Sequence, residues 1–227
     1  MQVSKEEANL LVELHEKNGG FDALDNVPHR IKILLDVSPV SPRDDENFST
    51  MVCAHRRYDF GDDDAINTLI SDLQDSKAYC EAWDDTLYSK HLPELEELAV
   101  KAGFLLLPIY MYDHSAQSVK TTPFGCSWDS GKIGFIYVTP SQARSWFGWK
   151  KITKSRRDEV FKYLDSDIQD YDKYLNVSQY YYAVENIFGD SLDSCCGFYG
   201  DDPKENGMDE HLPEGWEKLE VVTVTQH

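Results

Sequence analysis

The sequence predicts an α+β fold, with a central, mainly antiparallel sheet and helices packed against it. Aromatic residues make up 12% of the chain and hydrophobic residues 41%, which favours a packed core over disorder. Two strongly apolar, β-rich runs, 104–112 and 132–138, are separated by a turn-rich segment. Helical patterns concentrate early and strand patterns late, without strict alternation. We therefore expect both apolar runs in the central sheet.

The first forty-five residues are expected to form an N-terminal extension made of one helix and one strand. Ser4 and Glu7 fit a capping box, and the helical spacing that follows ends at Gly19. Residues 30–37 predict a strand that prolines terminate. The division that we expect is therefore 1–45 for the extension and 46–227 for the main α+β domain.

The main domain is expected to begin with a short strand at 50–54 and two helices. Three aspartates at 62–64 precede a helical pattern that reaches residue 73, and acidic side chains favour a helix N-terminus. Pro93 fits the first position of the next helix, which ends at Gly103. Residues 104–112 then predict a central strand, although Pro108 within it indicates a sheet edge or a bulge.

The second half of the chain predicts more strands and two further helices. Residues 119–122 and 132–138 predict strands around a turn, and 140–147 predicts a short helix. The longest helix is expected at 153–175, where apolar side chains recur on one face. Late strands are expected at 179–187, 191–195 and 219–225, with a surface loop at 201–215.

The charge and the cysteine content limit the classes of function. The net charge of −19 opposes binding to phosphate backbones and to anionic membranes, and it favours a basic partner or a solubilising surface. The five cysteines have no regular spacing, and the polar N-terminus does not resemble a secretory signal. No apolar run is long enough for a membrane span. The sequence therefore predicts a soluble, cytoplasmic protein without required disulfides.

Four polar segments follow or flank predicted strands, at 53–58, 112–115, 121–131 and 193–200. Binding and catalytic side chains are often carried by loops at strand ends. We expect four reactive side chains to lie close together at one end of the sheet as catalytic candidates: His55, His114, Cys126 and Asp129. The binding candidates beside them are Arg56, Asp113, Trp128 and Tyr199.

Each of these candidates also has a structural interpretation. Cys126 or Cys195 could be a nucleophile with a histidine base, but no family signature surrounds either cysteine, and buried cysteines are commonly core residues. Asp129 fits a tight turn that ends at Gly131. Histidine and aspartate could ligate a metal ion, but no recognised metal-site spacing occurs, so no metal is expected. No glycine-rich phosphate loop is present, and no cofactor is expected.

One stretch departs from the acidic background. Residues 144–162 carry seven lysines and arginines against two acidic residues, Asp158 and Glu159, and three aromatic rings lie among the first of these basic charges: Trp146, Phe147 and Trp149. Basic and aromatic side chains together can hold phosphates and stack bases. The alternative interpretation is a solvated helix face with the tryptophans buried against the sheet.

Four sequence segments carry a resemblance to known proteins: MVCAHRRYDFGD, LLPIYMYDHS, TTPFGCSWDSGKIGFIYV and DSCCGFYG. The chain resembles, over roughly residues 48–200, a family of uncharacterised proteins of bacteriophages and mobile elements. This resemblance implies a phage or prophage origin and a location in the host bacterial cell. It assigns no activity, cofactor or site residue.

Three hypotheses of function follow. In the first, the chain is a phage accessory protein, a non-enzymatic acidic binder of a basic host protein, for example one that acts in defence. In the second, it is a hydrolase-like enzyme that uses the His/Cys/Asp cluster. In the third, it is an interaction module that binds nucleic acid through the basic and aromatic stretch. The sequence leaves the oligomeric state open.

Overall fold

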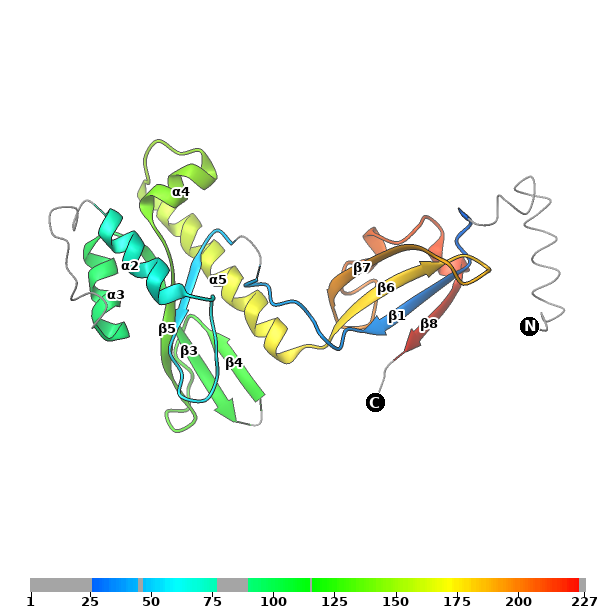
Figure 1. The fold of residues 1–227 in the computed structure, drawn as a ribbon, viewed down its shortest axis with the longest axis horizontal. Coiled ribbons are helices and arrows are strands. Elements are labelled where there is room, and N and C mark those ends of the chain that lie inside the picture. Colours follow the sequence, from blue (N-terminus) through cyan, green and yellow to red (C-terminus); the bar gives the residue numbers. More distant parts are fainter. Residues whose placement is uncertain (1–25, 45–46, 77–89, 115, 225–227) are drawn as a thin grey trace. The chain divides into compact units, whose positions relative to one another are not determined.

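A computed structural model describes residues 26–44, 47–76, 90–114 and 116–224 (Figure 1). The helix expected after Ser4 lies outside these residues. The chain forms two compact units, one of Met1–Val40 with Val177–His227 and one of Ser41–Asn176. Within the described segments, no helix has both the length and the apolar character needed to cross a membrane.

The Ser41–Asn176 unit contains a four-stranded sheet in the order β2-β5-β3-β4. Its strands are β2 (Thr50–Cys53), β3 (Leu105–His114), β4 (Ala116–Lys120) and β5 (Ser130–Val138), and all neighbouring pairs are antiparallel. Four helices accompany them in the described part of this unit: α2 (Ala65–Asp75), α3 (Leu92–Lys101), α4 (Pro140–Phe147) and α5 (Lys154–Asn176). The predicted α+β class is confirmed, and the two apolar runs pair with each other as β3 and β5.

Helices cover both faces of this sheet (Figure 1). Ile136 and Val138 of β5 pack with α4 and α5 side chains, whereas Phe135 and Tyr137 pack with α2 and α3 side chains. Successive strand residues point to opposite faces, so a strand that is covered on both sides requires apolar residues at every position. This explains why the β5 sequence is continuously apolar over its second half rather than alternating.

Pro108 lies where β3 has only one strand neighbour. It pairs with Phe135 of β5, while β4 begins to pair with β3 only at Tyr110. The register between β3 and β5 also shifts between Ile109 and Tyr110. A proline has no amide proton to donate, so a position beside a bulge with one free side accommodates it. Both interpretations of Pro108, a local edge and a bulge, therefore apply.

Gly134 allows β2 to approach β5 closely. A Cβ atom at this position would lie 2.0 Å from the carbonyl oxygen of Val52, so any larger residue would push the strands apart. The pairing of Cys53 with Gly134 is the last pair of the β2–β5 ladder. Gly134 thus allows the close approach of the two strands directly before the polar segment that follows β2.

The second unit has its own four-stranded sheet, in the order β7-β6-β1-β8. Its strands are β1 (Arg30–Leu35), β6 (Gln179–Glu185), β7 (Ser191–Tyr199) and β8 (Glu220–Val224). β1 pairs antiparallel with β6 and parallel with β8, and β6 pairs antiparallel with β7. The core lies on one face, under the short 3-10 helices Met208–Glu210 and Trp216–Lys218.

This grouping differs from the division that we expected between residues 45 and 46. The expected extension contributes β1, which is the strand between β6 and β8 of the second unit. Ile31 and Ile33 of β1 are buried with Tyr180 and Tyr182 of β6. Pairing between strands about 150 residues apart leaves no local mark on the sequence, because each strand has the same period-two pattern whichever sheet it joins.

Candidate functional site

A pocket opens at the end of the Ser41–Asn176 sheet where β2 and β3 end and β5 begins. It has a volume of about 320 Å³ and is lined by residues 54–57, Met111, Asp113 and residues 128–133. Antiparallel pairing places these segments together, because Cys53 lies opposite Gly134 and Tyr112 lies opposite Ser130. The pocket size is at the low end of the range for small-ligand sites.

Asp129 contacts two other predicted catalytic residues, His114 and Cys126. Its Oδ2 atom lies 3.7 Å from Nδ1 of His114 and 3.9 Å from Sγ of Cys126. Its backbone oxygen accepts a hydrogen bond of 2.8 Å from the amide of Asp113. His114, Cys126 and Asp129 are therefore brought together from the end of β3 and the segment before β5.

Asp113 is paired with a different set of side chains. Arg57 donates a hydrogen bond to its Oδ2 atom, and the hydroxyl of Tyr58 donates to Oδ1 at 3.2 Å. The ring of Tyr58 is in turn stacked on His55, with centroids 5.1 Å apart. His55 lies in the wall of the same pocket, so the segment after β2 is held against the end of β3 by this chain of contacts.

Two further cations lie in the pocket wall. Lys132 forms an ion pair of 2.5 Å with Glu96 of α3. Arg56 is exposed and forms no ion pair with any residue in the described part of the chain. Most charged side chains of the pocket wall are thus in ion pairs, and within the described residues the guanidinium of Arg56 is not.

Trp128 stands out from the rest of the pocket wall because its side chain is 94% exposed. The turn that carries it is held from both sides. The hydroxyl of Ser130 donates to the backbone oxygen of Cys126, and Asp129 accepts from the amide of Asp113. The structure therefore places an exposed ring, at a predicted binding residue, on a turn that hydrogen bonds hold in place.

Tyr199 is not part of this arrangement. It lies in β7 of the other unit, where it pairs with Gln179 of β6. Cys195, the second candidate nucleophile, also lies in β7. Among the predicted site residues in the Ser41–Asn176 unit, those that line the pocket are His55, Arg56, Asp113, Trp128 and Asp129, and two more contact Asp129.

The geometry fits a histidine–carboxylate pair better than a cysteine nucleophile. A nucleophilic thiol needs a cationic or basic partner that favours its thiolate. The side-chain partner of Cys126 is the carboxylate of Asp129, which lies between it and His114. Within the described residues, no group of three or more histidine, cysteine and acidic side chains could hold a metal ion.

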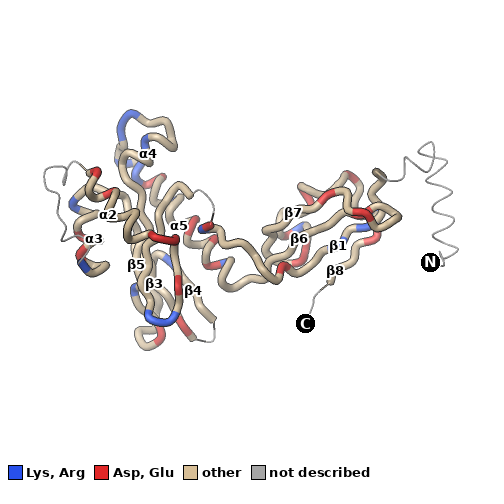
Figure 2. The backbone as a smooth tube through the Cα atoms, viewed as in Figure 1, with Lys and Arg blue, Asp and Glu red and all other residues tan. Residues whose placement is uncertain are grey.

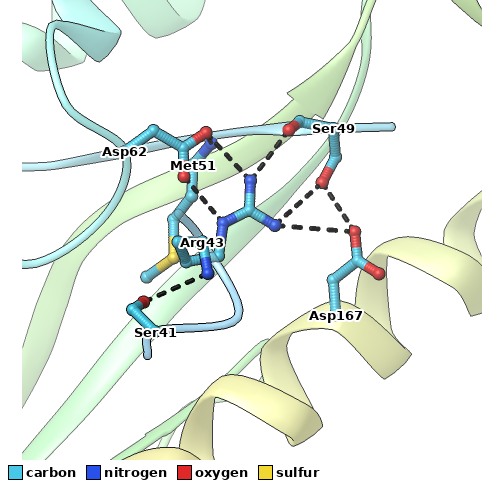
Figure 3. A network of polar contacts seen from close by, with 6 residues as sticks. All are labelled: Ser41, Arg43, Ser49, Met51, Asp62 and Asp167. Atoms are coloured by element: carbon cyan, nitrogen blue, oxygen red, sulfur yellow. Dashed lines mark hydrogen bonds and ion pairs between the residues drawn. The ribbon is translucent and has the colours of Figure 1, made fainter. Parts of the chain in front are cut away.

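A second polar cluster, centred on Arg43, was not predicted from the sequence (Figure 3). The Arg43 side chain is only 3% exposed. Its Nε and Nη2 atoms lie 2.7 and 2.9 Å from the two carboxylate oxygens of Asp62, and Nη2 also donates to the backbone oxygen of Ser49 at 2.8 Å. Asp62 accepts a further hydrogen bond of 2.9 Å from the amide of Met51.

The same cluster reaches helix α5 through Asp167. The hydroxyl of Ser49 donates a hydrogen bond of 2.6 Å to Oδ2 of Asp167. Nη1 of Arg43 lies 3.8 Å from the same Asp167 oxygen (Figure 3). Burial raises the pKa of Asp167, while the Ser49 hydrogen bond and Arg43 oppose that rise. Asp62 lies just before α2, as expected, and its carboxylate also links Met51 of β2 to Arg43 in the segment before that strand. This cluster links the segment before β2, the segment before α2, and α5.

Comparisons of the chain with protein-family models, with curated proteins and with solved structures find no match.

Proposed function

We propose that the chain is a non-enzymatic binder of another protein, with Trp128 as the centre of the binding surface. The supporting observation is the 94% exposure of this side chain on a turn that hydrogen bonds hold in place. A tryptophan carries a large apolar area, and leaving that area in water is unfavourable. Tryptophan and arginine are also the residues most enriched where protein interfaces gain their affinity, and Arg56 lies in the same pocket wall.

The fixed turn increases the benefit of burying Trp128. Ordering a mobile side chain or loop on binding costs free energy, and a residue that is already positioned avoids part of that cost. Truncation of a central interface tryptophan typically costs about 2 kcal/mol or more, which is roughly a 30-fold loss of affinity. The neighbouring pocket, of about 320 Å³, offers space for a side chain of the partner.

The partner is proposed to be a basic protein of the host bacterial cell. The chain carries 41 acidic and 22 basic residues, and this excess attracts positively charged surfaces over a distance. The resemblance to phage proteins supports a host target. A host defence protein with a basic, nucleic-acid-binding surface fits this proposal, because such a surface carries the positive charge that an acidic molecule attracts.

The experiment places a photoreactive group at the proposed centre. Trp128 is replaced by p-benzoylphenylalanine in bacterial cells, and the cells are irradiated. The control carries the same substitution at Val100, which is 58% exposed on α3. We expect a discrete covalent adduct at position 128 and none at position 100. Equal labelling at both positions, or none at 128, would overturn the proposal.

The pocket also gives one specific observation in favour of a hydrolase-like enzyme. His114 lies 3.7 Å from Asp129, and a carboxylate beside a histidine can orient a general base. Turnover of a panel of p-nitrophenyl esters and phosphates tests this alternative. Turnover that the substitution His114→Gln abolishes, with an unchanged melting temperature, would favour the enzyme over the binder.

A further inference from the structure

The turn between α4 and α5 carries a concentration of basic side chains, and together with the adjacent aromatic rings we name it the α4–α5 surface. Figure 2 shows these lysine and arginine positions gathered over α4 and the start of α5. All but Arg144 and Arg156 of the basic residues are exposed, and the full set is Arg144, Lys150, Lys151, Lys154, Arg156, Arg157 and Lys162. The same stretch contains two exposed acidic residues, Asp158 and Glu159, in the following turn of α5.

These basic side chains differ from most other lysines and arginines in the described residues because they form no ion pair with an acidic side chain. Arg30, Lys32, Arg57 and Lys132 each form an ion pair. In the described residues, no ion pair involves any basic residue of the α4–α5 surface. In a chain with a net charge of −19, a group of unpaired cations indicates a surface that is available to an anionic ligand.

Exposed aromatic rings lie beside these cations. Trp146 is 62% exposed and Tyr163 is 47% exposed. The ring of Phe48 lies between them, with its centroid 5.4 Å from that of Trp146 and 6.4 Å from that of Tyr163. Sequence alone allowed both tryptophans of this stretch to be buried against the sheet, but Trp146 presents most of its area to solvent.

Residues of the turn contact one another through two rings and the side chain of Arg156. Trp149 is stacked on Phe147 with centroids 4.3 Å apart, and the guanidinium of Arg156 lies 5.0 Å from the Trp149 ring. Nη1 of Arg156 donates to the backbone oxygen of Lys151 at 2.8 Å. Arg156 therefore supports the turn, while Lys150, Lys151, Lys154 and Arg157 remain exposed.

We propose that the α4–α5 surface binds single-stranded nucleic acid, in addition to the protein-binding role proposed above. The bases of a single strand are free to stack on Trp146 and Tyr163, and the phosphates lie within reach of the flanking lysines. A duplex hides its bases within the stack and brings a second charged strand toward a largely acidic molecule. An anionic lipid surface or an acidic protein would use the charges but not the two stacking rings.

The experiment measures binding of a fluorescein-labelled oligothymidylate of about 20 nucleotides by anisotropy at several salt concentrations. If the surface contacts four phosphates, the logarithm of the association constant should fall with the logarithm of the salt concentration at a slope of about −3. This slope corresponds to roughly a 50-fold loss of affinity between 50 and 200 mM salt. The variant Lys150→Gln/Lys151→Gln should make this negative slope less steep by about 1.4. The matched control, Lys204→Gln/Lys218→Gln, removes the same charge from the other unit and should leave the slope unchanged.

Two further variants test stacking separately from charge. Trp146→Ala should weaken binding by about 10-fold, since a stacked base contributes about 1–3 kcal/mol, and Trp146→Phe should restore most of it. Binding of heparin, of duplex DNA or of anionic vesicles as tightly as the oligothymidylate, without an effect of Trp146→Ala, would overturn the proposal. Equal effects of the two lysine pairs would overturn it as well.

Discussion

The guanidinium of Arg43 and the carboxylate of Asp62 form a two-point ion pair in which the arginine is buried and the aspartate is partly buried. Both contacts are short, at 2.7 and 2.9 Å, and Ser49 and Asp167 occupy the remaining sides of the guanidinium. A buried charge is expensive unless paired, so each partner in this cluster depends on the others. The cluster joins the segment before β2, the segment before α2, and α5.

The first prediction is that Arg43→Met destabilises the Ser41–Asn176 unit by about 3 kcal/mol, because the substitution leaves the partly buried carboxylates of Asp62 and Asp167 without their cation. The measurement is urea denaturation followed by near-ultraviolet circular dichroism. The matched control is Arg30→Met, which removes a more exposed ion pair with Glu220 and should cost less than about 1 kcal/mol. Equal losses for the two variants would contradict the prediction.

The second prediction concerns Asp72, whose pKa is raised mainly by burial, although a hydrogen bond from Tyr137 opposes the rise. A carboxyl with a raised pKa in the folded state binds a proton more tightly there than in the unfolded chain. Its contribution to stability is therefore greatest at low pH and is lost as the pH rises through the folded pKa. Asp72→Asn keeps an oxygen acceptor for Tyr137 and removes the charge.

The melting temperature of Asp72→Asn relative to the natural chain should consequently be higher at pH 7 than at pH 4. Thermal melts at both values provide the measurement. Asp63→Asn, at an exposed position before α2, is the control for the simple loss of one negative charge. A relative stabilisation that is larger at pH 4 than at pH 7 would show that the sign is wrong.

The sequence predicted best those elements whose ends are set by local interactions. The helix expected at 140–147 is α4 (Pro140–Phe147), because Thr139 and Gln142 form a capping box and Gly148 takes the left-handed conformation after the last turn. The helix expected at 153–175 is α5 (Lys154–Asn176), where the apolar side chains that recur at helical spacing are the buried ones.

Features that depend on distant residues were not predicted. The Arg43 cluster joins residues that are 19 and 118 positions apart along the chain, and nothing near Arg43 indicates its partners. The division of the strands into two sheets was not predicted either, because it depends on pairing between segments that are distant along the chain. The pocket was accessible to prediction because antiparallel pairing collects loops at one end of a sheet, but the sequence did not indicate that Asp129 would lie between His114 and Cys126.

The third prediction concerns the reactivity of two thiols. Burial, with a smaller effect of Asp62, raises the pKa of Cys53 to about 12, so at pH 8 only about 1 in 10,000 of these thiols is ionised. Cys196 is exposed on β7. In a Cys80→Ser background, Ellman's reagent should label Cys196 in the folded protein and Cys53 only after unfolding. Rapid labelling of Cys53 in the native state would contradict this.

The fourth prediction is that reductant does not change the thermal stability. Cys53, Cys126, Cys195 and Cys196 are all free thiols in the structure. Melting temperatures with and without a phosphine reductant should coincide within experimental error. A marked drop in the presence of the reductant would require a stabilising disulfide, and mass spectrometry after alkylation would then locate it.

The last prediction separates the contribution of the Trp128 ring to the proposed protein interaction from that of the acidic surface. It uses the partner captured at position 128. Trp128→Ala should increase the dissociation rate by roughly 30-fold, because the buried ring acts after the complex has formed. Charge reversal at the exposed residues Asp59 and Asp63 should instead slow association, and the effect should shrink as salt rises, because free charges are screened within about 8–10 Å at physiological ionic strength. Asp62 is unsuitable for this test because it holds Arg43.

Stopped-flow or surface-plasmon kinetics at two salt concentrations measure both rates. The charge control is reversal at Glu214 and Glu217, two exposed acidic residues of the other unit, which should slow association less than reversal at Asp59 and Asp63. If Trp128→Ala changes only the association rate, the ring is not a buried anchor. If neither acidic pair affects association at low salt, the partner is not attracted by charge, and a basic partner is then the wrong proposal.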